Sequence, residues 1–142
     1  MRAPRIVIDT NVFVAALLSR RGASHRLLKL IDSNEFQTFI STPLVLEYED
    51  VALRMLEKTT LTEEELGIII DYLCATAHPQ EVFYLWRPFL RDAKDDMVLE
   101  LAVAARCDAI ITFNLRHFEG AERFGIKILT PKQFLRQIGE LP

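Results

Sequence analysis

Three acidic residues and one asparagine occupy the junctions between apolar segments of this 142-residue sequence. A predicted strand or helix begins or ends near each of them, and they are Asp9, Glu47, Asp96 and Asn114. Carboxylate and amide oxygens, without histidine or cysteine, form a hard-oxygen ligand set that suits Mg²⁺ or Mn²⁺. Such an ion activates water and stabilises the charge that develops on a phosphodiester. These residue types therefore predict a metal-dependent hydrolytic site, provided that the fold brings them together.

Asp9 ends a segment that is aliphatic at positions 6–8, which is typical of a strand buried on both faces. A predicted helix over residues 12–18 follows almost directly. Asp9 is therefore expected at the carboxyl edge of a parallel sheet, where open α/β folds bind ligands. Helix capping explains an aspartate here as well, with Thr10 or Asn11 sharing that work.

Glu47 falls about one helical turn after Pro43, near the start of the helix that leaves the second predicted strand. It shares a stripe at three- and four-residue spacing with other polar residues, namely Asp50, Arg54 and Glu57. A solvated polar face explains this stripe as well as a site does, so Glu47 alone leaves both interpretations open.

Asp96 and Glu100 lie four residues apart on one face of a helix that is otherwise apolar. Like charges at this spacing oppose each other by a few tenths of a kcal/mol, roughly. The pair therefore predicts a cation nearby, although the helix dipole also favours an acid in the first turn. The neighbouring Asp92 and Asp95 are explained by capping.

Thr112 and Asn114 follow the fourth aliphatic segment and are expected at the same sheet edge as Asp9. An asparagine in a loop often serves only as a turn former. His117 is interpreted as a surface or capping residue, because no second histidine stands at ligand spacing.

The elements that must position these residues alternate between strands and helices. Strands are predicted at 5–8, 36–41, 81–84, 109–112 and 127–129. Helices are predicted at 12–18, 24–31, 42–57, 63–77, 92–106 and from 131 onward, with Ser24 and Thr62 as caps. This alternation, without repeats or linkers, predicts one α/β domain over residues 1–142 with a doubly wound parallel sheet.

Composition limits the classes of function. The formal net charge of −3 excludes a strongly basic nucleic-acid binder that works by bulk attraction. Cys74 and Cys107 lack ligand-like spacing, so reduced thiols and a cytoplasmic location are expected. Neither a signal peptide nor an apolar run of membrane-spanning length is recognised, so no membrane association is expected.

The order and spacing of these residues resemble the PIN-domain family, ribonucleases that include the toxins of bacterial and archaeal toxin–antitoxin pairs. The resemblance covers essentially the whole chain and rests on Asp9-Thr10-Asn11, Glu47 and Asp96. It implies a three-layer α/β/α sandwich with strand order 3-2-1-4-5, Mg²⁺- or Mn²⁺-dependent cleavage of RNA, and a small antitoxin protein as partner. The family often has aspartate where this chain has Asn114, and an amide contributes no charge to a second metal.

Positive residues border the predicted site despite the acidic total. RNA contacts are expected from Arg20, Arg21 and Arg116. Arg87, Arg91 and Lys94 also lie in segments that border the predicted site. These residues should give salt-dependent binding, although solvated surface charge is an equally good interpretation.

A homodimer is expected from residues 66–74, because this helix is apolar around more than one face. Aromatic and apolar residues that follow would extend the same surface, namely Tyr84, Leu85, Trp86 and Phe89. Packing of the helix between the sheet and a neighbouring helix is the alternative.

Two other functions remain as alternatives to a ribonuclease. A haloacid-dehalogenase-type phosphatase needs a second aspartate two residues after the first, and Asn11 occupies that position. A PIN-like module that binds RNA or protein with little or no catalysis is favoured by Asn114.

Overall fold

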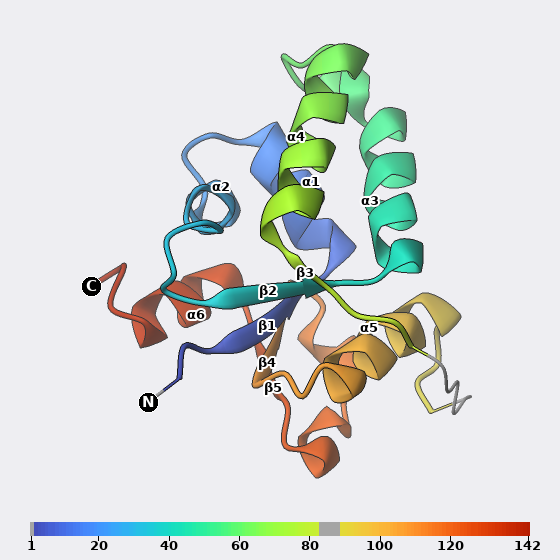
Figure 1. Cartoon of the computed structure of the whole chain (residues 1–142), viewed down its shortest axis with the longest axis vertical. Helices are drawn as coiled ribbons and strands as arrows, with labels where there is room; N and C mark the ends of the chain where they lie inside the picture. The colour runs from blue at the N-terminus through green and yellow to red at the C-terminus, as the bar shows by residue number, and fades with distance from the viewer. Residues whose placement is uncertain (1, 83–88) are drawn as a thin grey trace.

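The computed structural model describes residues 2–82 and 89–142, and a five-stranded parallel sheet lies at its centre (Figure 1). The strands are β1 (Arg5–Ile8), β2 (Gln37–Ile40), β3 (His78–Pro79), β4 (Ala109–Ile111) and β5 (Lys127–Leu129). Their order across the sheet is β3-β2-β1-β4-β5. The register places Ile6 opposite Thr38 of β2 and Ala109 of β4. The predicted fold class and strand order are therefore confirmed.

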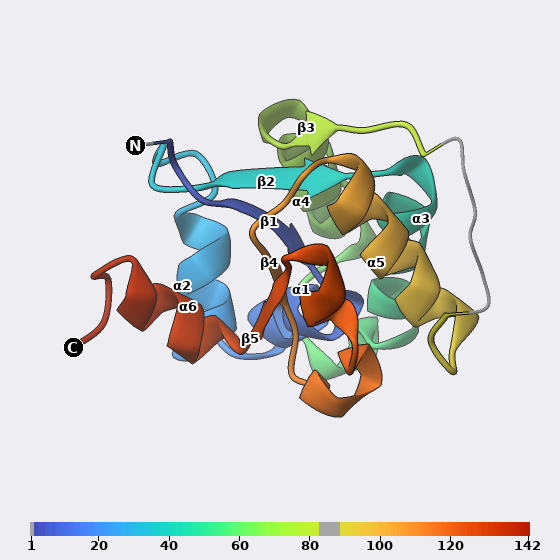
Figure 2. The same cartoon turned by 90° about the horizontal axis from the view of Figure 1, so that it is seen from below.

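Helices connect the strands and supply the outer layers. They are α1 (Thr10–Leu18), α2 (Ala23–Lys29), α3 (Thr42–Arg54), α4 (Glu63–Thr76), α5 (Ala93–Ala104) and α6 (Pro131–Gln137). Short 3₁₀ turns occur at η1 (Leu56–Lys58), η2 (Leu115–Phe118) and η3 (Ala121–Phe124). Figures 1 and 2 show α2 and α6 together on one side of the sheet and α5 on the other.

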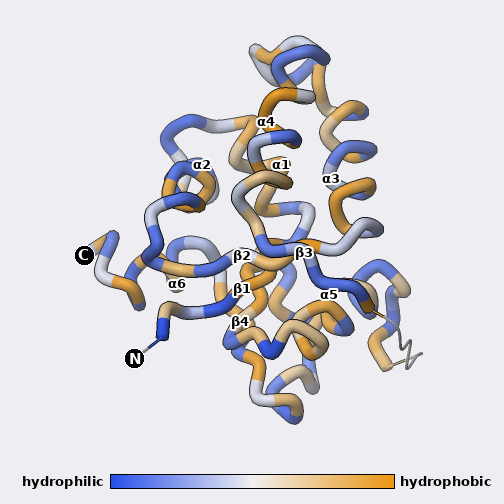
Figure 3. Tube along the Cα trace, viewed as in Figure 1, coloured by the Kyte–Doolittle hydropathy of each residue, from blue (hydrophilic) through white to orange (hydrophobic). Residues whose placement is uncertain are grey.

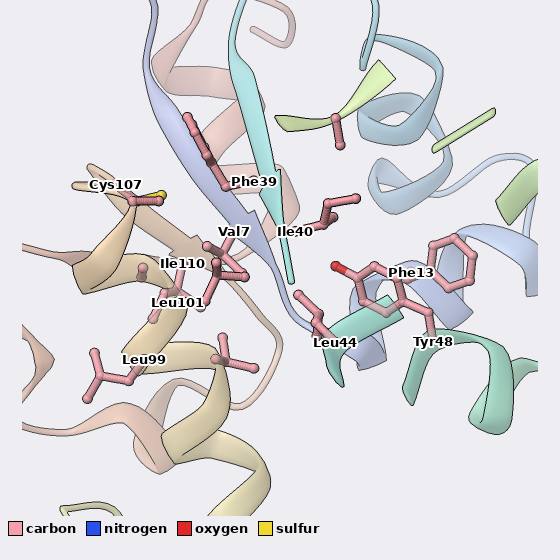
Figure 4. Packing of buried hydrophobic residues seen from close by; sticks show 14 of the residues in the cluster. Val7, Phe13, Phe39, Ile40, Leu44, Tyr48, Leu99, Leu101, Cys107 and Ile110 are labelled. Atoms are coloured by element: carbon pink, nitrogen blue, oxygen red, sulfur yellow. The ribbon is translucent and has the colours of Figure 1, made fainter. Parts of the chain in front are cut away.

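The core follows from the alternation of side chains along β1. Val7 packs in a cluster with Ile110 and with Leu99 and Leu101 of α5, as Figure 4 shows. The other face of the strand belongs to a second cluster, which includes Ile6, Ile8, Leu27, Phe134 and Leu135. Figure 3 shows the hydrophobic stretch through β1 and β4 where the two strands run side by side. Both faces of the central strands are thus covered, as parallel sheets require.

Local sequence signals explain where most helices begin. Thr62 and Glu65 form the predicted capping box of α4, and Thr130 forms another with Gln133 at α6. Ser41 caps α3, and Pro43 follows within its first turn. These hydrogen bonds satisfy backbone N–H groups that have no partner inside the helix.

Several predicted elements differ from the observed ones. Gly22, not Ser24, is the N-cap of α2, and Ser24 lies buried inside the helix. The third described strand is β3, earlier than the predicted 81–84, because its two residues already pair with Phe39 and Ile40 of β2. Helix α3 ends at Arg54 and gives way to η1, so the prediction that it reaches residue 57 was wrong.

Helix α4 buries one stripe through Leu66, Ile70 and Leu73, while Ile68 stays 62% exposed and Tyr72 stays 44% exposed. Of the residues expected to extend this surface, 84, 85 and 86 lie outside the described part of the chain, as do residues 83–84 of the predicted third strand. Over residues 2–82 and 89–142, no helix combines the length and apolarity needed to cross a membrane.

Candidate active site

The carboxyl ends of β1, β2 and β4 meet at one edge of the sheet, and the sequence-predicted residues follow from them. Asp9 comes directly after β1 and is the N-cap of α1. Glu47 lies in α3, which leaves β2, and Thr112 directly follows β4. Asp9 is only 7% exposed and Thr112 is fully buried, so both belong to the interior of this edge.

Asp9 is held in place by hydrogen bonds to both of its carboxylate oxygens. The backbone N–H of Thr10 donates to Oδ1 over 2.8 Å, and the Thr112 hydroxyl donates to Oδ2 over 2.8 Å. Burial raises the pKa of Asp9, the two hydrogen bonds oppose this shift, and the nearby Glu47 charge adds to it. The capping interpretation is therefore correct as far as it goes, but it does not account for the second acid beside Asp9.

Thr112 is the centre of a small hydrogen-bond network that ties β4 to α1. Besides its bond to Asp9, its Oγ1 accepts from the Asn114 backbone N–H over 3.0 Å and from the Asn11 amide over 3.4 Å. The Asn11 side-chain oxygen in turn accepts from the backbone N–H of Phe113. Asn11 and Thr112 therefore hold the loop after β4 against the start of α1.

Glu47 joins Asp9 through Thr10, whose hydroxyl donates to Glu47 Oε2 over 3.1 Å. The other oxygen of Glu47 lies 3.2 Å from Lys94 Nζ, in an ion pair whose carboxylate is 15% exposed and whose ammonium is 64% exposed. The polar stripe on α3 does not explain Glu47, because Asp50 and Arg54 pair with each other in solvent. The structure thus brings Glu47 into the site.

Tyr48, the residue after Glu47, is buried beneath the site and links α3 to the end of β1. Its hydroxyl donates to the carbonyl of Ile8, and its ring stacks on Phe13 with centroids 4.7 Å apart (Figure 4). Burial raises the pKa of Tyr48 well above its ordinary value, and the charges of Asp9 and Glu47 add to the shift. Sequence reasoning missed this residue, because an aromatic residue on a helix signals only core packing.

Helix α5 supplies a third carboxylate, and the structure favours Asp95 for this position over the predicted Asp96. The Asp95 side chain is 13% exposed, and its Oδ2 lies 3.4 Å from Nδ1 of His117. The pKa of Asp95 is raised to about 6, mainly by burial and next by the charges of Asp9 and Asp92. Asp95 therefore lies within the electrostatic range of Asp9.

Asp96 is 1% exposed, and its Oδ1 accepts from the buried backbone N–H of Leu90 over 2.8 Å. Asp92 caps α5 as predicted, because its carboxylate accepts from the Lys94 backbone N–H. Capping was also the role predicted for Asp95, but in the structure Asp95 lies within α5 and pairs with His117.

The remaining predicted residues lie around this core. Glu100 is 2% exposed and lines a groove of about 970 Å³ together with residues of α3 and α5, including Lys94 and Met97. Asn114 is exposed and precedes η2, and its link to the site runs through its backbone N–H and Thr112. The His117 ring is 55% exposed, as predicted for a surface histidine, but it pairs with Asp95 and lowers the pKa of Asp9, so it borders the site.

The cations expected to contact RNA fall into two groups. Arg116 lies in η2, two residues after Asn114, Lys94 lies in the first turn of α5, and Arg91 precedes the N-cap of that helix. Arg20 and Arg21 instead follow the far end of α1, ten and eleven residues after Thr10, where the helix starts at the site. Residue 87 lies outside the described part of the chain.

The acids of this edge suit a hard cation by their chemistry, and their mutual repulsion favours one. As the side chains lie, however, no three acidic, histidine or cysteine residues among 2–82 and 89–142 are arranged to share an ion. Glu47 is paired with Lys94, and both oxygens of Asp9 accept hydrogen bonds. The carboxylates therefore fit a divalent ion if Glu47 releases the Lys94 ammonium group and binds the ion instead.

Lowering the pH from 7 to 5 is expected to stabilise the metal-free protein through Asp95. Its pKa is about 6 in the folded protein against 3.8 for an unperturbed aspartate. Between these values the folded state binds more protons than the unfolded chain, so the free energy of unfolding rises as the pH falls. Thermal melts in a chelating buffer should show that Asp95→Asn lacks this component and that the exposed Asp71→Asn control retains it. Equal pH dependence in all three proteins would contradict the assignment.

A family model for the PIN domain matches residues 5–116. The chain therefore belongs to the PIN-domain family, whose members are generally nucleases that use divalent metal ions, and the predicted family is confirmed. Among solved structures, the chain is similar to VapBC2 from Rickettsia felis bound to a DNA fragment from their promoter. The TM-score is 0.58 at 13% identity, and the match covers 89% of this chain and 98% of that one, which shows a common fold. No curated protein matches the sequence at a significant level.

Proposed function

We propose that residues 1–142 form one PIN-like domain that acts as a metal-dependent endoribonuclease. The observation that carries this proposal is the convergence of Asp9, Glu47 and Asp95 at the edge of the sheet, where burial and neighbouring charge raise the pKa of Asp9 and of Asp95. Carboxylates that are costly to hold together without a cation are favoured when they bind one. Family membership supports the reaction class, since PIN domains are generally nucleases.

The proposed roles follow from position. Asp9, Glu47 and Asp95 hold the ion, and Asp96 and Asn114 remain candidates for its outer ligands. A bound Mg²⁺ or Mn²⁺ would activate water and stabilise the phosphodiester charge. Supporting residues orient these groups, namely Thr10, Asn11, Glu100 and Thr112.

The substrate is expected to be RNA, with Arg116, Arg91 and Lys94 as nearby phosphate contacts. Cleavage of a labelled single-stranded RNA by the purified chain tests the proposal, with Mg²⁺ or Mn²⁺ added and then removed by a chelator. Internal cuts that require the metal are expected. Absence of cleavage with either ion, on RNA that the protein binds, would contradict a nuclease.

That last result would favour the second candidate, a PIN-like module that binds RNA or protein without cutting. Two observations support this candidate. Asn114 supplies an amide where a further acid would add charge, and Lys94 already neutralises Glu47.

We also propose that the chain is a toxin held by a small antitoxin protein in the cytoplasm, because the chain belongs to the PIN-domain family and shares its fold with the VapBC2 structure. A homodimer is proposed through α4, where a shallow apolar hollow of about 230 Å³ includes Ile68 and Tyr72. Co-purification of a small protein and light scattering of the isolated chain test the two parts separately.

Changing Asn114 to aspartate is expected to tighten metal binding or raise the cleavage rate, because a carboxylate attracts a divalent ion more strongly than an amide does. The rate should be measured across a full Mg²⁺ titration, with Asn34→Asp as a control in an exposed turn remote from the sheet edge. A rate that is unchanged at every Mg²⁺ concentration would show that position 114 lies outside the metal shell.

A further inference from the structure

Besides the cations near the site, a positively charged surface lies away from the carboxylates. It is a depression of about 710 Å³, here called the basic hollow, bounded by the loop after α1, by α2 and by α6. The basic residues that line it are Arg20, Arg21, His25, Arg26, Lys29 and Lys132. Among the described residues, its lining contains no aspartate or glutamate. The loop between α1 and α2 is accordingly hydrophilic in Figure 3.

The concentration of charge in the basic hollow is unusual for this chain. Five of its 17 lysine and arginine residues line the hollow, although the formal net charge is −3. Subtracting these five positive charges leaves −8 for the rest of the protein. Like charges held near one another repel, so a bound polyanion would relieve a cost that the free protein carries.

Most of the basic side chains of the hollow lie at the protein surface and do not surround a closed cavity. Arg20, Arg21, Lys29 and Lys132 are exposed, and Arg26 is oriented by an ion pair with Glu140 over 3.2 Å. Exposed cations spread over three chain segments match successive phosphates of a nucleic-acid backbone. A small anion would instead call for buried donors that converge on one point.

The position of the basic hollow relative to the carboxylates sets the length of the ligand. Helix α1 begins next to Asp9 and has nine residues, so Arg20 lies beyond its far end, about 13 Å along the helix axis. Figures 1 and 2 both show α2 and α6 on the side of the sheet opposite α5. One extended strand of a few nucleotides therefore spans the distance from the cut to the hollow.

We propose that the basic hollow binds the phosphate backbone of the single-stranded RNA segment that flanks the cleaved bond. This inference rests on the proposed ribonuclease function for its choice of ligand. It assigns Lys29, Lys132 and Arg26 to RNA binding together with Arg20 and Arg21, and it separates all five from the Arg116 side of the site.

Binding without cleavage tests the proposal. A fluorescein-labelled single-stranded RNA of about 20 nucleotides exceeds the span of one such site, and its anisotropy is read in a chelating buffer at several salt concentrations. The hollow variant is R20A/K29A/K132A. Its affinity is expected to fall at least about tenfold, and its salt slope to fall by about 2, since each phosphate contact to a single strand contributes roughly 0.7.

The matched control, R54A/K58A/R123A, removes the same charge from exposed positions elsewhere and should change both quantities much less. R20K/R21K retains the charge and should bind as the unaltered protein does. An equal loss in the control and hollow variants would overturn the proposal, as would a hollow that supports binding of duplex DNA but not of RNA.

The result also separates this inference from the proposed function. Metal-dependent cleavage with RNA affinity unaltered in the hollow variant would refute the basic hollow and retain the nuclease. Loss of RNA affinity in the hollow variant of a chain that cuts nothing would support the hollow and refute the nuclease.

Discussion

Asp9→Asn is expected to abolish metal-dependent RNA cleavage while leaving the fold intact. Asp9 lies at the end of β1 with one oxygen bonded to the Thr10 N–H and the other to the Thr112 hydroxyl, and an asparagine is nearly the same size. The loss in rate should be at least about 100-fold, because even groups that only orient a metal ligand contribute roughly 10- to 100-fold to affinity or activity.

Stability gives an independent reading of the same substitution. Burial raises the pKa of Asp9, so the charged carboxylate destabilises the metal-free folded state. Metal-free Asp9→Asn should therefore melt no lower than the unaltered protein. Excess Mn²⁺ should raise the melting temperature of the unaltered protein but not that of the Asp9→Asn protein. The stabilisation is about 2.7 kcal/mol at a metal concentration of roughly 100 times Kd.

The control for both measurements is Asp71→Asn, which replaces an exposed carboxylate on α4. It should retain cleavage and the response to Mn²⁺. Equal stabilisation of the Asp9→Asn protein by Mn²⁺ would show that the ion binds elsewhere. Full cleavage by that variant would refute the role of Asp9 in the reaction.

Most strands and helices of the fold could be predicted from the sequence, because their signals are local. The aliphatic run 6–8 and the aliphatic residues 109–111 became β1 and β4, buried on both faces as such runs predict. Alternating strands and helices then require a parallel sheet, and the family resemblance supplied the strand order. The third strand was misplaced because β3 has only two residues and owes its pairing to Phe39 and Ile40, a contact that no local pattern reveals.

The site was predicted less completely, because its geometry depends on distant contacts. The bond from Thr112 to Asp9 and the pair of Lys94 with Glu47 join segments far apart in the chain. Asp96 was predicted as a site residue because its neighbours on α5 are apolar. In the structure its buried carboxylate accepts a hydrogen bond from the backbone N–H of Leu90. Arg20 and Arg21 follow Asp9 closely in sequence. Helix α1 lies between Asp9 and these two arginines, so their charges lie away from the edge of the sheet.

Asp95 and Asp96 are expected to separate function from stability. Asp95→Asn should reduce cleavage at least about tenfold, because its carboxylate is the one placed near Asp9 and His117. At pH 7 the metal-free Asp95→Asn protein should unfold at no lower temperature than the unaltered protein, because burial and the neighbouring charges that raise the pKa of Asp95 destabilise its charged form in the folded state.

Asp96→Ala should instead leave the Leu90 N–H buried without its partner, which costs about 1–3 kcal/mol of unfolding free energy. Asp96→Asn retains a side-chain oxygen that can accept from the same N–H, and it should recover most of that stability. Denaturant unfolding and cleavage assays on the three variants test the division directly. If Asp96→Asn is stable but cleaves as poorly as Asp95→Asn, then Asp96 also acts in the reaction, and its buried carboxylate must reach the metal when the ion binds.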